Sequence, residues 1–294
     1  MHPSSLQTAD AFEHHRARLF GIAYRMLGSV ADAEDVLQEV YLRWHHADPE
    51  AVRSAEAWLV AVTTRLAIDA LRRASRERDR YVGQWLPEPV ATGTPAAPAD
   101  ARGELAADLS MAFLVLLERL SPEERAALLL HDVFGAPYDE VARVLEKSEA
   151  ACRQLVHRAR LRVRDDGRRR NTVPIEAKEQ LAQRFVASLA AGDEAALLAL
   201  VAPDAPWIAD GGGKVPVARN LRGAARIVQF LLRLARKAPA TRRLVWINGE
   251  PAIATYAGGR LFSTVSLDTD GERVLAFYAV VNPEKLARLT AAEG

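Results

Sequence analysis

The chain has 294 residues, enough for two or three domains, and its 49% apolar and 26% charged content is ordinary for globular proteins. The formal net charge is +1, so any contact with nucleic acid must come from local basic patches. Cys152 is the only cysteine, which excludes an intramolecular disulfide and a cysteine-rich metal site. We expect no metal and no cofactor. The N-terminus does not read as a signal peptide, and no run of about eighteen apolar residues occurs, so we expect a cytoplasmic protein without a membrane segment.

The first block, from about Ala11 to Arg80, is helical in pattern. Ser29 is a good N-cap for a helix with two distinct faces. Its apolar residues are expected to point to a core: Val36, Leu37, Val40, Tyr41 and Trp44. The other face is acidic and amide-bearing: Asp32, Glu34, Asp35, Gln38 and Glu39. Such a face indicates a protein partner.

A further helix from Ala57 to Arg78 carries charged residues toward its end: Arg65, Asp69, Arg72 and Arg73. A connector rich in Pro and Gly follows at 83–98 and marks a domain boundary. Trp85 and Leu86 lie in this connector, where exposing them would waste apolar area. We therefore expect them to dock.

A second helical block, from about Ala101 to Arg170, predicts a helix-turn-helix. Ser121 and Pro122 begin a helix that is expected to run to Phe134. Tyr138–Leu145 forms a short helix, a turn follows at 146–148, and a longer polar helix begins after Ser148. Glu146 stands where such turns often carry glycine.

The last of these helices is strongly basic. Ser148 is its expected N-cap, and its apolar stripe comprises Ala151, Leu155, Val156, Ala159 and Val163. The remaining positions offer side chains for bases or nearby phosphates (Arg153, Gln154, His157) and mainly for phosphates (Arg158, Arg160, Arg164). For any one of these residues, a solvated or structural role is the alternative.

Beyond residue 171 the pattern changes to α+β. Helices are expected at Ile175–Ala191, Asp193–Val201 and through Ile227–Ala235, with a glycine-rich loop at Asp210–Lys214. Four alternating runs follow at 243–249, 252–256, 261–267 and 273–281, separated by hairpin turns. Helices followed by a meandering antiparallel sheet are therefore predicted.

Three motifs in order resemble the extracytoplasmic-function sigma factors of bacteria: Ala33–Glu39, Trp58–Leu59 with Asp69–Arg73, and the helix-turn-helix ending at His157–Arg160. The resemblance covers roughly residues 10–166 and implies three partners: promoter DNA and the beta and beta-prime subunits of RNA polymerase core. The acidic helix would dock on the polymerase clamp through Asp32, Glu34, Asp35, Gln38, Glu39 and Arg43. The helix at Leu120–Phe134 would face the polymerase flap.

The same resemblance assigns two DNA sites. The loop near His45–Ser54 would capture flipped-out bases of the minus-10 element, together with Arg65, Asp69, Arg72 and Arg73. The minus-35 element would be read by Ser148, Arg153, Gln154, His157, Arg158, Arg160 and Arg164.

The tail resembles SnoaL-like polyketide cyclases, which are cone-shaped α+β domains related to ketosteroid isomerases. Three segments resemble signatures of the sigma-factor group that carries this fused domain: Trp85–Pro89, Asp210–Lys214 and Asn282–Leu286. The residues expected to link the domains are Trp85, Leu86, Pro87, Asp210, Gly211, Gly212, Gly213, Lys214, Asn282 and Pro283. The predicted fold is thus two all-α sigma domains, region 2 (1–80) and region 4 (105–170), joined by a linker (81–104) and followed by a SnoaL-like domain (171–294).

Two hypotheses for the tail remain. It can regulate the sigma domains in cis, or it can keep a catalytic or ligand-binding cone with Asp210 as general base among Trp207, Phe230, Trp246 and Tyr278. For the whole chain, the alternatives to a sigma factor are a helix-turn-helix regulator, or a cyclase-like enzyme that binds or converts a small molecule. We expect a monomer when the chain is free and no enzymatic activity. Whether the tail binds an unknown small ligand stays open.

Overall fold

The computed structural model describes residues 5–48, 52, 54–78, 80–93, 109–164, 173–237 and 240–292. The chain divides into two compact units. The first comprises Met1–Asp79, Pro98–Leu109 and Phe113–Arg169, and the second comprises Arg80–Ala97, Ser110–Ala112 and Arg170–Gly294. Most of the predicted linker therefore belongs with the tail rather than between free domains.

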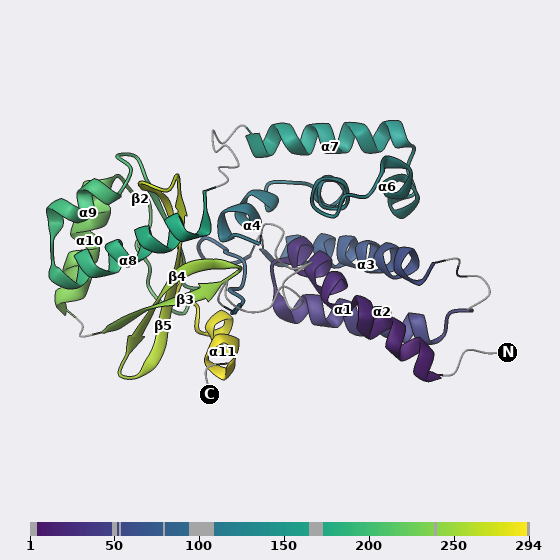
Figure 1. Ribbon diagram of the computed structural model, residues 1–294, viewed down its shortest axis with the longest axis horizontal. Helices are drawn as coiled ribbons and strands as arrows, with labels where there is room; N and C mark the ends of the chain where they lie inside the picture. The colour runs from purple at the N-terminus through teal and green to yellow at the C-terminus, as the bar shows by residue number, and fades with distance from the viewer. Residues whose placement is uncertain are drawn as a thin grey trace. The chain divides into compact units, whose positions relative to one another are not determined.

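A bundle of α1 (Ser5–Leu27), α2 (Val30–His45) and α3 (Ala55–Arg78) begins the first unit (Figure 1). Ser29 caps α2, since its hydroxyl accepts the backbone N–H of Asp32 at 3.3 Å. The predicted core residues of α2 are buried, except Tyr41, which is 36% exposed. That expectation was wrong because Tyr41 lies at the border of the buried stripe, where its ring packs edge-on against Phe12.

The rest of the first unit contains α4 (Met111–Leu117) from Phe113 on, α5 (Pro122–Leu128), the π-helix η3 (Leu129–Val133), α6 (Tyr138–Leu145) and α7 (Glu149–Arg164). Ser121 and Glu124 form a capping box at the start of α5, as expected from its sequence. The expected continuous helix to Phe134 instead widens into a π-helix, where the N–H of Phe134 bonds to the carbonyl of Leu129.

The helix-turn-helix prediction is confirmed by α6 and α7. Glu146 adopts the left-handed conformation, with φ 54°, that glycine usually supplies in this turn. Ser148 caps α7 by accepting the N–H of Ala151 at 3.2 Å. The buried core between the helices includes Val141 and Val144 of α6 and Cys152, Leu155 and Val156 of α7. Cys152 is a small buried residue of this core.

A six-stranded sheet in the order β2-β1-β6-β5-β4-β3 forms the centre of the second unit. Its strands are β1 (Pro206–Asp210), β2 (Leu221–Arg222), β3 (Thr241–Ile247), β4 (Glu250–Ala257), β5 (Arg260–Thr269) and β6 (Val274–Val280). The last four make the predicted antiparallel meander. The strands β1 and β2 were not predicted, and β1 pairs in parallel with β6. Asp210 therefore ends a strand rather than lying within a loop.

Helices α8 (Ile175–Ala191), α9 (Glu194–Leu200) and α10 (Ala224–Lys237) pack with the sheet, and α11 (Pro283–Ala292) follows β6. Figure 1 shows α8 crossing the sheet and α9 beside α10. The core is aromatic: the Trp207 ring lies 5.4 Å from Phe277 and 5.6 Å from Phe230. The α+β prediction is confirmed, with helices first and most of the sheet after.

No described helix combines the length and the hydropathy that crossing a lipid bilayer requires.

Substitutions at Glu146 measure the cost of its left-handed conformation. Glu146→Gly and Glu146→Ala both remove the exposed ion pair with Arg65, but only glycine adopts φ 54° without strain. We expect the glycine variant to be the more stable by about 1 kcal/mol in urea unfolding followed by circular dichroism. Equal unfolding midpoints and slopes for the two variants would contradict this account.

Candidate functional site

The N-terminal half of α7 presents the side chains predicted to read bases. Arg153, Gln154 and His157 are all exposed. The Arg153 guanidinium pairs with Glu149 at 2.6 Å and lies over the Tyr138 ring, 5.1 Å from its centroid. With the other described residues, Gln154 and His157 make no side-chain hydrogen bond. These two side chains can therefore bind a base without first breaking an internal contact.

The arginines farther along α7 are bound within their own domain. Arg158 donates to Glu124 at 3.1 Å, and Arg160 donates to both oxygens of Asp132 at 2.9 and 2.6 Å. Arg162, which the sequence reading did not select, also pairs with Glu124. The side chain of Arg164 lies outside the described residues. A DNA phosphate that contacts these arginines would therefore displace the carboxylates already paired with them, or would share the guanidinium groups with those carboxylates.

Glu124 is the carboxylate that binds two of these arginines. Its side chain is only 3% exposed, and it accepts hydrogen bonds from Arg158, Arg162 and the backbone of Ser121. Burial by itself raises the pKa of Glu124, but the hydrogen bonds from Ser121 and Arg158 outweigh burial and hold the pKa below its usual value. The carboxylate therefore stays charged and fixes α7 on α5.

The predicted polymerase-binding face lies along α2. Asp32, Asp35 and Glu39 line a groove of about 280 Å³ whose opposite side includes Arg73 of α3. Asp35 and Gln38 are exposed. The adjoining Leu42 is 48% exposed, an exposed apolar side chain that sequence reasoning missed.

Two acids of this face are already paired. Glu34 accepts from Arg16 at 2.6 Å, and Glu39 accepts from Arg43 at 2.7 Å, four residues along α2. These pairs are exposed, so each contributes little to stability and exchanges readily for another cation.

Two of the four predicted minus-10 residues on α3, Arg65 and Arg72, bond to the helix-turn-helix domain. Arg65 donates to the backbone carbonyls of Val144 at 2.9 Å and Arg143 at 3.0 Å. Arg72 pairs with Asp69 at 3.0 Å and also with Glu123. Arg73 remains exposed. Residues 49–51 and 53 of the predicted base-capturing loop lie outside the described residues.

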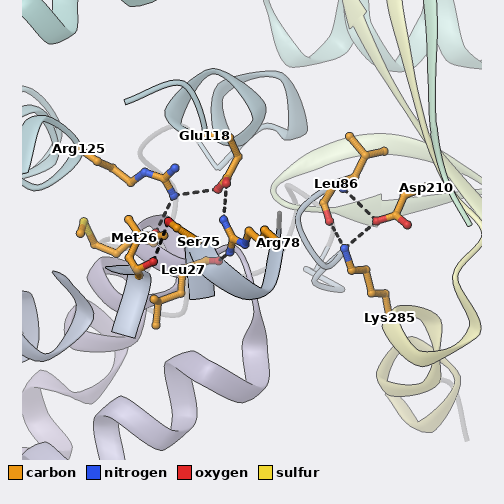
Figure 2. Close-up of polar contacts among 10 residues, drawn as sticks. Met26, Leu27, Ser75, Arg78, Leu86, Glu118, Arg125, Asp210 and Lys285 are labelled. Carbon is orange, nitrogen blue, oxygen red and sulfur yellow. Dashed lines mark hydrogen bonds and ion pairs between the residues drawn. The ribbon is translucent and has the colours of Figure 1, made fainter. Parts of the chain in front are cut away.

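Asp210 is the centre of a buried polar cluster in the second unit. Its Oδ1 accepts the Tyr81 hydroxyl at 2.6 Å and the Gly212 N–H at 2.9 Å. Its Oδ2 accepts the Leu86 N–H at 2.9 Å and the Lys285 ammonium at 2.7 Å (Figure 2). The residue is 0% exposed, so these four donors replace its entire solvation.

Lys285 and Tyr81 were absent from the predicted site. Lys285 also donates to the Leu86 carbonyl, and its Nζ lies 4.2 Å from the centroid of the Trp85 ring. Burial, together with hydrogen bonding to Asp210, raises the pKa of Tyr81, so its hydroxyl stays protonated and donates. Lys285 lies within the segment 282–286 already singled out, but only the fold shows which of its residues turns toward Asp210.

Asn282 joins this cluster to α11. Its Nδ2 donates to the Tyr81 hydroxyl at 2.9 Å, and its Oδ1 accepts the Glu284 N–H at 3.1 Å. Pro283 is the first residue of α11, where it lacks only an N–H that would have no partner in the helix.

The three glycines after Asp210 are required by close contacts. Gly212 has φ 60°, and a Cβ there would lie 2.4 Å from Nδ2 of Asn282. Gly213 has φ 71°, and a Cβ would lie 2.9 Å from Cβ of Val82 in the connector. At Gly211 the clash would be with the Val215 carbonyl. Lys214, next in the loop, pairs at the surface with Glu284.

The connector has a second attachment on the β3–β4 hairpin. The Val90 N–H donates to Oδ1 of Asn248 at 2.9 Å, and the Asn248 N–H donates to the Val90 carbonyl at 2.8 Å. Thr92 adds bonds to Trp246 and Gly249. We call residues 81–92 the strap, since both of its ends are bonded to the tail. Leu86, Pro87, Glu88 and Pro89 between these ends are buried.

The geometry does not favour Asp210 as a general base. All its hydrogen bonds go to groups that hold the chain in place, and its two oxygens already accept four donors. Trp207 and Phe230, which the ligand-binding hypothesis placed around a cavity, are in edge-to-face contact with each other. These side chains fill a core.

Comparisons with known proteins agree with both halves of the chain. The Sigma-70 region 2 family matches residues 11–77, and the Sigma-70, region 4 family matches residues 110–163. The "ECF RNA polymerase sigma factor SigJ" of Mycobacterium tuberculosis is 39% identical over 287 residues, covering 93% of this chain and 91% of that protein. The "Probable ECF RNA polymerase sigma factor SigI" of the same species is 31% identical, covering 97% of this chain and 96% of that protein.

The crystal structure of M. tuberculosis SigJ has the same fold, with a TM-score of 0.76 at 37% identity, covering 95% of this chain and 98% of that chain. The resemblance inferred from the three sequence motifs is confirmed. The chain therefore belongs to the extracytoplasmic-function RNA polymerase sigma factors, which are not enzymes, and acts in transcription initiation by binding RNA polymerase core and promoter DNA.

Proposed function

We propose that three surfaces of the sigma domains divide the work of initiation and that the tail regulates them in cis through the strap. The acidic face of α2 binds the clamp of the beta-prime subunit, and α5 with η3 faces the flap of the beta subunit. The end of α3 captures minus-10 bases, and α7 reads the minus-35 element. Binding of the strap to Asp210 is the observation that carries the regulatory part.

The division of roles along α7 follows from what each side chain already binds. Gln154 and His157 are exposed and make no side-chain hydrogen bond to other described residues, so they bind bases at the lowest cost. Arg153 has a flexible, exposed ion pair to give up. Arg158 and Arg160 hold carboxylates of their own domain and present what remains of their charge to phosphates. Phosphate contacts position the helix and base contacts specify the sequence.

Arg153→Ala is expected to change promoter preference, because a bidentate base contact discriminates by about 1–3 kcal/mol. Promoters would first be identified by run-off transcription of host genomic DNA with core polymerase and this chain. Variants of the strongest promoter, mutated base by base in the minus-35 element, are then compared. We expect Arg153→Ala to lose activity on the parent promoter and to lose discrimination at one base position.

Arg158→Ala is the matched comparison on the same helix. It is expected to weaken all promoters alike and to lower the salt dependence of binding, as a phosphate contact does. Identical promoter profiles for Arg153→Ala and the unmodified chain would refute base reading by Arg153.

Connectivity and burial both support regulation by the tail. The strap is part of the segment that joins α3 to α4, and therefore region 2 to region 4. It begins three residues after α3 ends, so a change at Asp210 acts directly on the path between the two promoter-binding regions. A buried carboxylate that holds two connector groups, the Tyr81 hydroxyl and the Leu86 N–H, is suited to hold or release this path.

Asp210→Ala is expected to release the strap, because it leaves the Lys285 ammonium without its buried counter-ion. Loss of one partner of a buried ion pair costs about 3–5 kcal/mol, so thermal unfolding of the tail should shift to lower temperature. Transcript yield from the chain's own promoters should change at least about twofold, while the choice among promoters stays the same. Run-off transcription on the promoter set measures both quantities.

Glu272→Gln is the matched control, since it removes an exposed carboxylate from a turn of the same domain. Deleting residues 171–294 tests the tail as a whole. Unchanged transcript yield in both Asp210→Ala and the deletion would rule out regulation. Saturable binding of a small molecule by the full chain, lost in Asp210→Ala, would favour the ligand-binding alternative.

A further inference from the structure

The tail contains a long segment that carries positive charge and no acid. Between Asp210 and Glu250 the sequence has nine Lys and Arg residues and neither Asp nor Glu. The chain as a whole has a net charge of only +1, so this segment is unusual in separating the two signs. Part of this charge lies on α10, a helix that none of the proposed polymerase, promoter or strap contacts uses.

α10 has an apolar side and a basic side. Four apolar residues are buried in the core of the tail: Ile227, Val228, Leu231 and Leu232. The side chains of Arg226, Arg233 and Lys237 are exposed. Spacings of seven and four residues keep three side chains within about 40° of one line along a helix, over roughly 16 Å. We call these three residues the basic row.

The basic row binds no acid in the part of the chain that the structure describes. None of its three cations forms an ion pair with a described carboxylate. The described ion pairs of the tail involve other cations instead: Lys178, Lys214, Lys285 and Arg288. An exposed cation that has no partner of its own keeps its charge available to an anion outside the chain.

Helix stability does not account for the basic row. A cation in the last turn of a helix is favoured by the helix dipole, which suits Lys237. Arg226 lies in the first turn, where the same dipole disfavours a cation. Arg233 has the like-charged Arg236 and Lys237 three and four residues farther on, an arrangement that destabilises a helix. An anionic partner explains the charge better than the fold does.

A groove of about 380 Å³ lies beside the basic row. Its described lining comprises Glu194, Gln229, Leu232, Arg233, Arg236 and Lys237, which is three cations against one acid. Arg, Lys and Gln are side chains that commonly bind the phosphate oxygens of DNA. This lining contains no aromatic residue to anchor a protein partner, and the buried apolar side of α10 cannot insert into a lipid surface. Duplex DNA is therefore the occupant that fits.

The tail is tethered close to the helix proposed to read the minus-35 element. Ten residues, 165–174, lie between the end of α7 and the start of α8. Ten residues span at most about 35 Å, which is roughly one turn of duplex, and a domain of this size adds roughly one turn more. The basic row therefore stays within about two turns of the DNA bound by α7, at a high effective concentration.

We propose that the basic row binds backbone phosphates of duplex DNA near the minus-35 element. The tail then adds a sequence-independent contact to the promoter. Its contribution is electrostatic, because each neutralised phosphate releases counterions. The position of the contact rests on the proposed minus-35 role of α7, whereas phosphate binding itself does not.

Replacing the basic row by glutamine, as Arg226→Gln, Arg233→Gln and Lys237→Gln in one chain, removes its charge and keeps good helix formers at exposed positions. Holoenzyme assembled from core polymerase and this variant is titrated on the strongest promoter fragment of the run-off set, at salt concentrations from about 50 to 200 mM. Three lost phosphate contacts lower the slope of log affinity against log salt by about 2.7. Over that range the unmodified holoenzyme is expected to lose about 40-fold more affinity than the variant.

Arg184→Gln, Arg260→Gln and Arg273→Gln together are the matched control, since they remove the same charge from exposed positions of the same domain. We expect the control to keep the unmodified salt slope, and both variants to keep the unmodified unfolding temperature. Equal slopes for the row variant and the control would overturn phosphate binding by the row. Weaker binding of core polymerase by the row variant, with an unchanged DNA slope, would also overturn it in favour of an acidic protein surface.

Hydroxyl-radical footprints of the same complexes locate the contact on the promoter. We expect backbone protection within about two turns of the minus-35 element that is present with the control and missing with the row variant. Row-dependent protection farther away would support phosphate binding and overturn the minus-35 role of α7, on which the position rests. The absence of any row-dependent protection would overturn the proposal itself.

Discussion

The second unit depends on one interaction, the burial of the Asp210 carboxylate beneath the strap. A charged group with no exposure is tolerated only when every lone pair finds a donor, and here Tyr81, Leu86, Gly212 and Lys285 supply them. Two of these donors come from the strap and two from the tail. The linker of a sigma factor thereby becomes part of the tail's own fold.

In the first unit, arginine side chains likewise bind acceptors of the protein itself. Arginines of α7 hold Glu124 and Asp132, and arginines of α3 hold region 4. A chain with net charge +1 can still offer positive charge to DNA because the guanidinium groups of these pairs are about half exposed, although Glu124 and Asp132 themselves are largely buried. Arg125, which pairs with Glu118, differs, since it is buried and is not available to exchange its carboxylate for a phosphate.

Local signals in the sequence predicted local structure well. The caps at Ser29, Ser121 and Ser148 and the helical spacing of apolar residues indicated the helices, and Gly-containing turns indicated the hairpins, because each signal acts within a few residues. The π-helix after Leu128 and the parallel pairing of β1 with β6 were missed. Both are set by packing between segments that no local pattern connects.

The sequence by itself determined the family, the helix-turn-helix and the motifs that meet at Asp210, since those depend on residue types at fixed spacings. Tertiary structure alone decided which partners those residues have. Lys285 reaches Asp210 across 75 positions, and Arg125 reaches Met26 across 99. Such contacts are selected by the free energy of burying charge with its partner, which is a property of the folded chain and not of any segment.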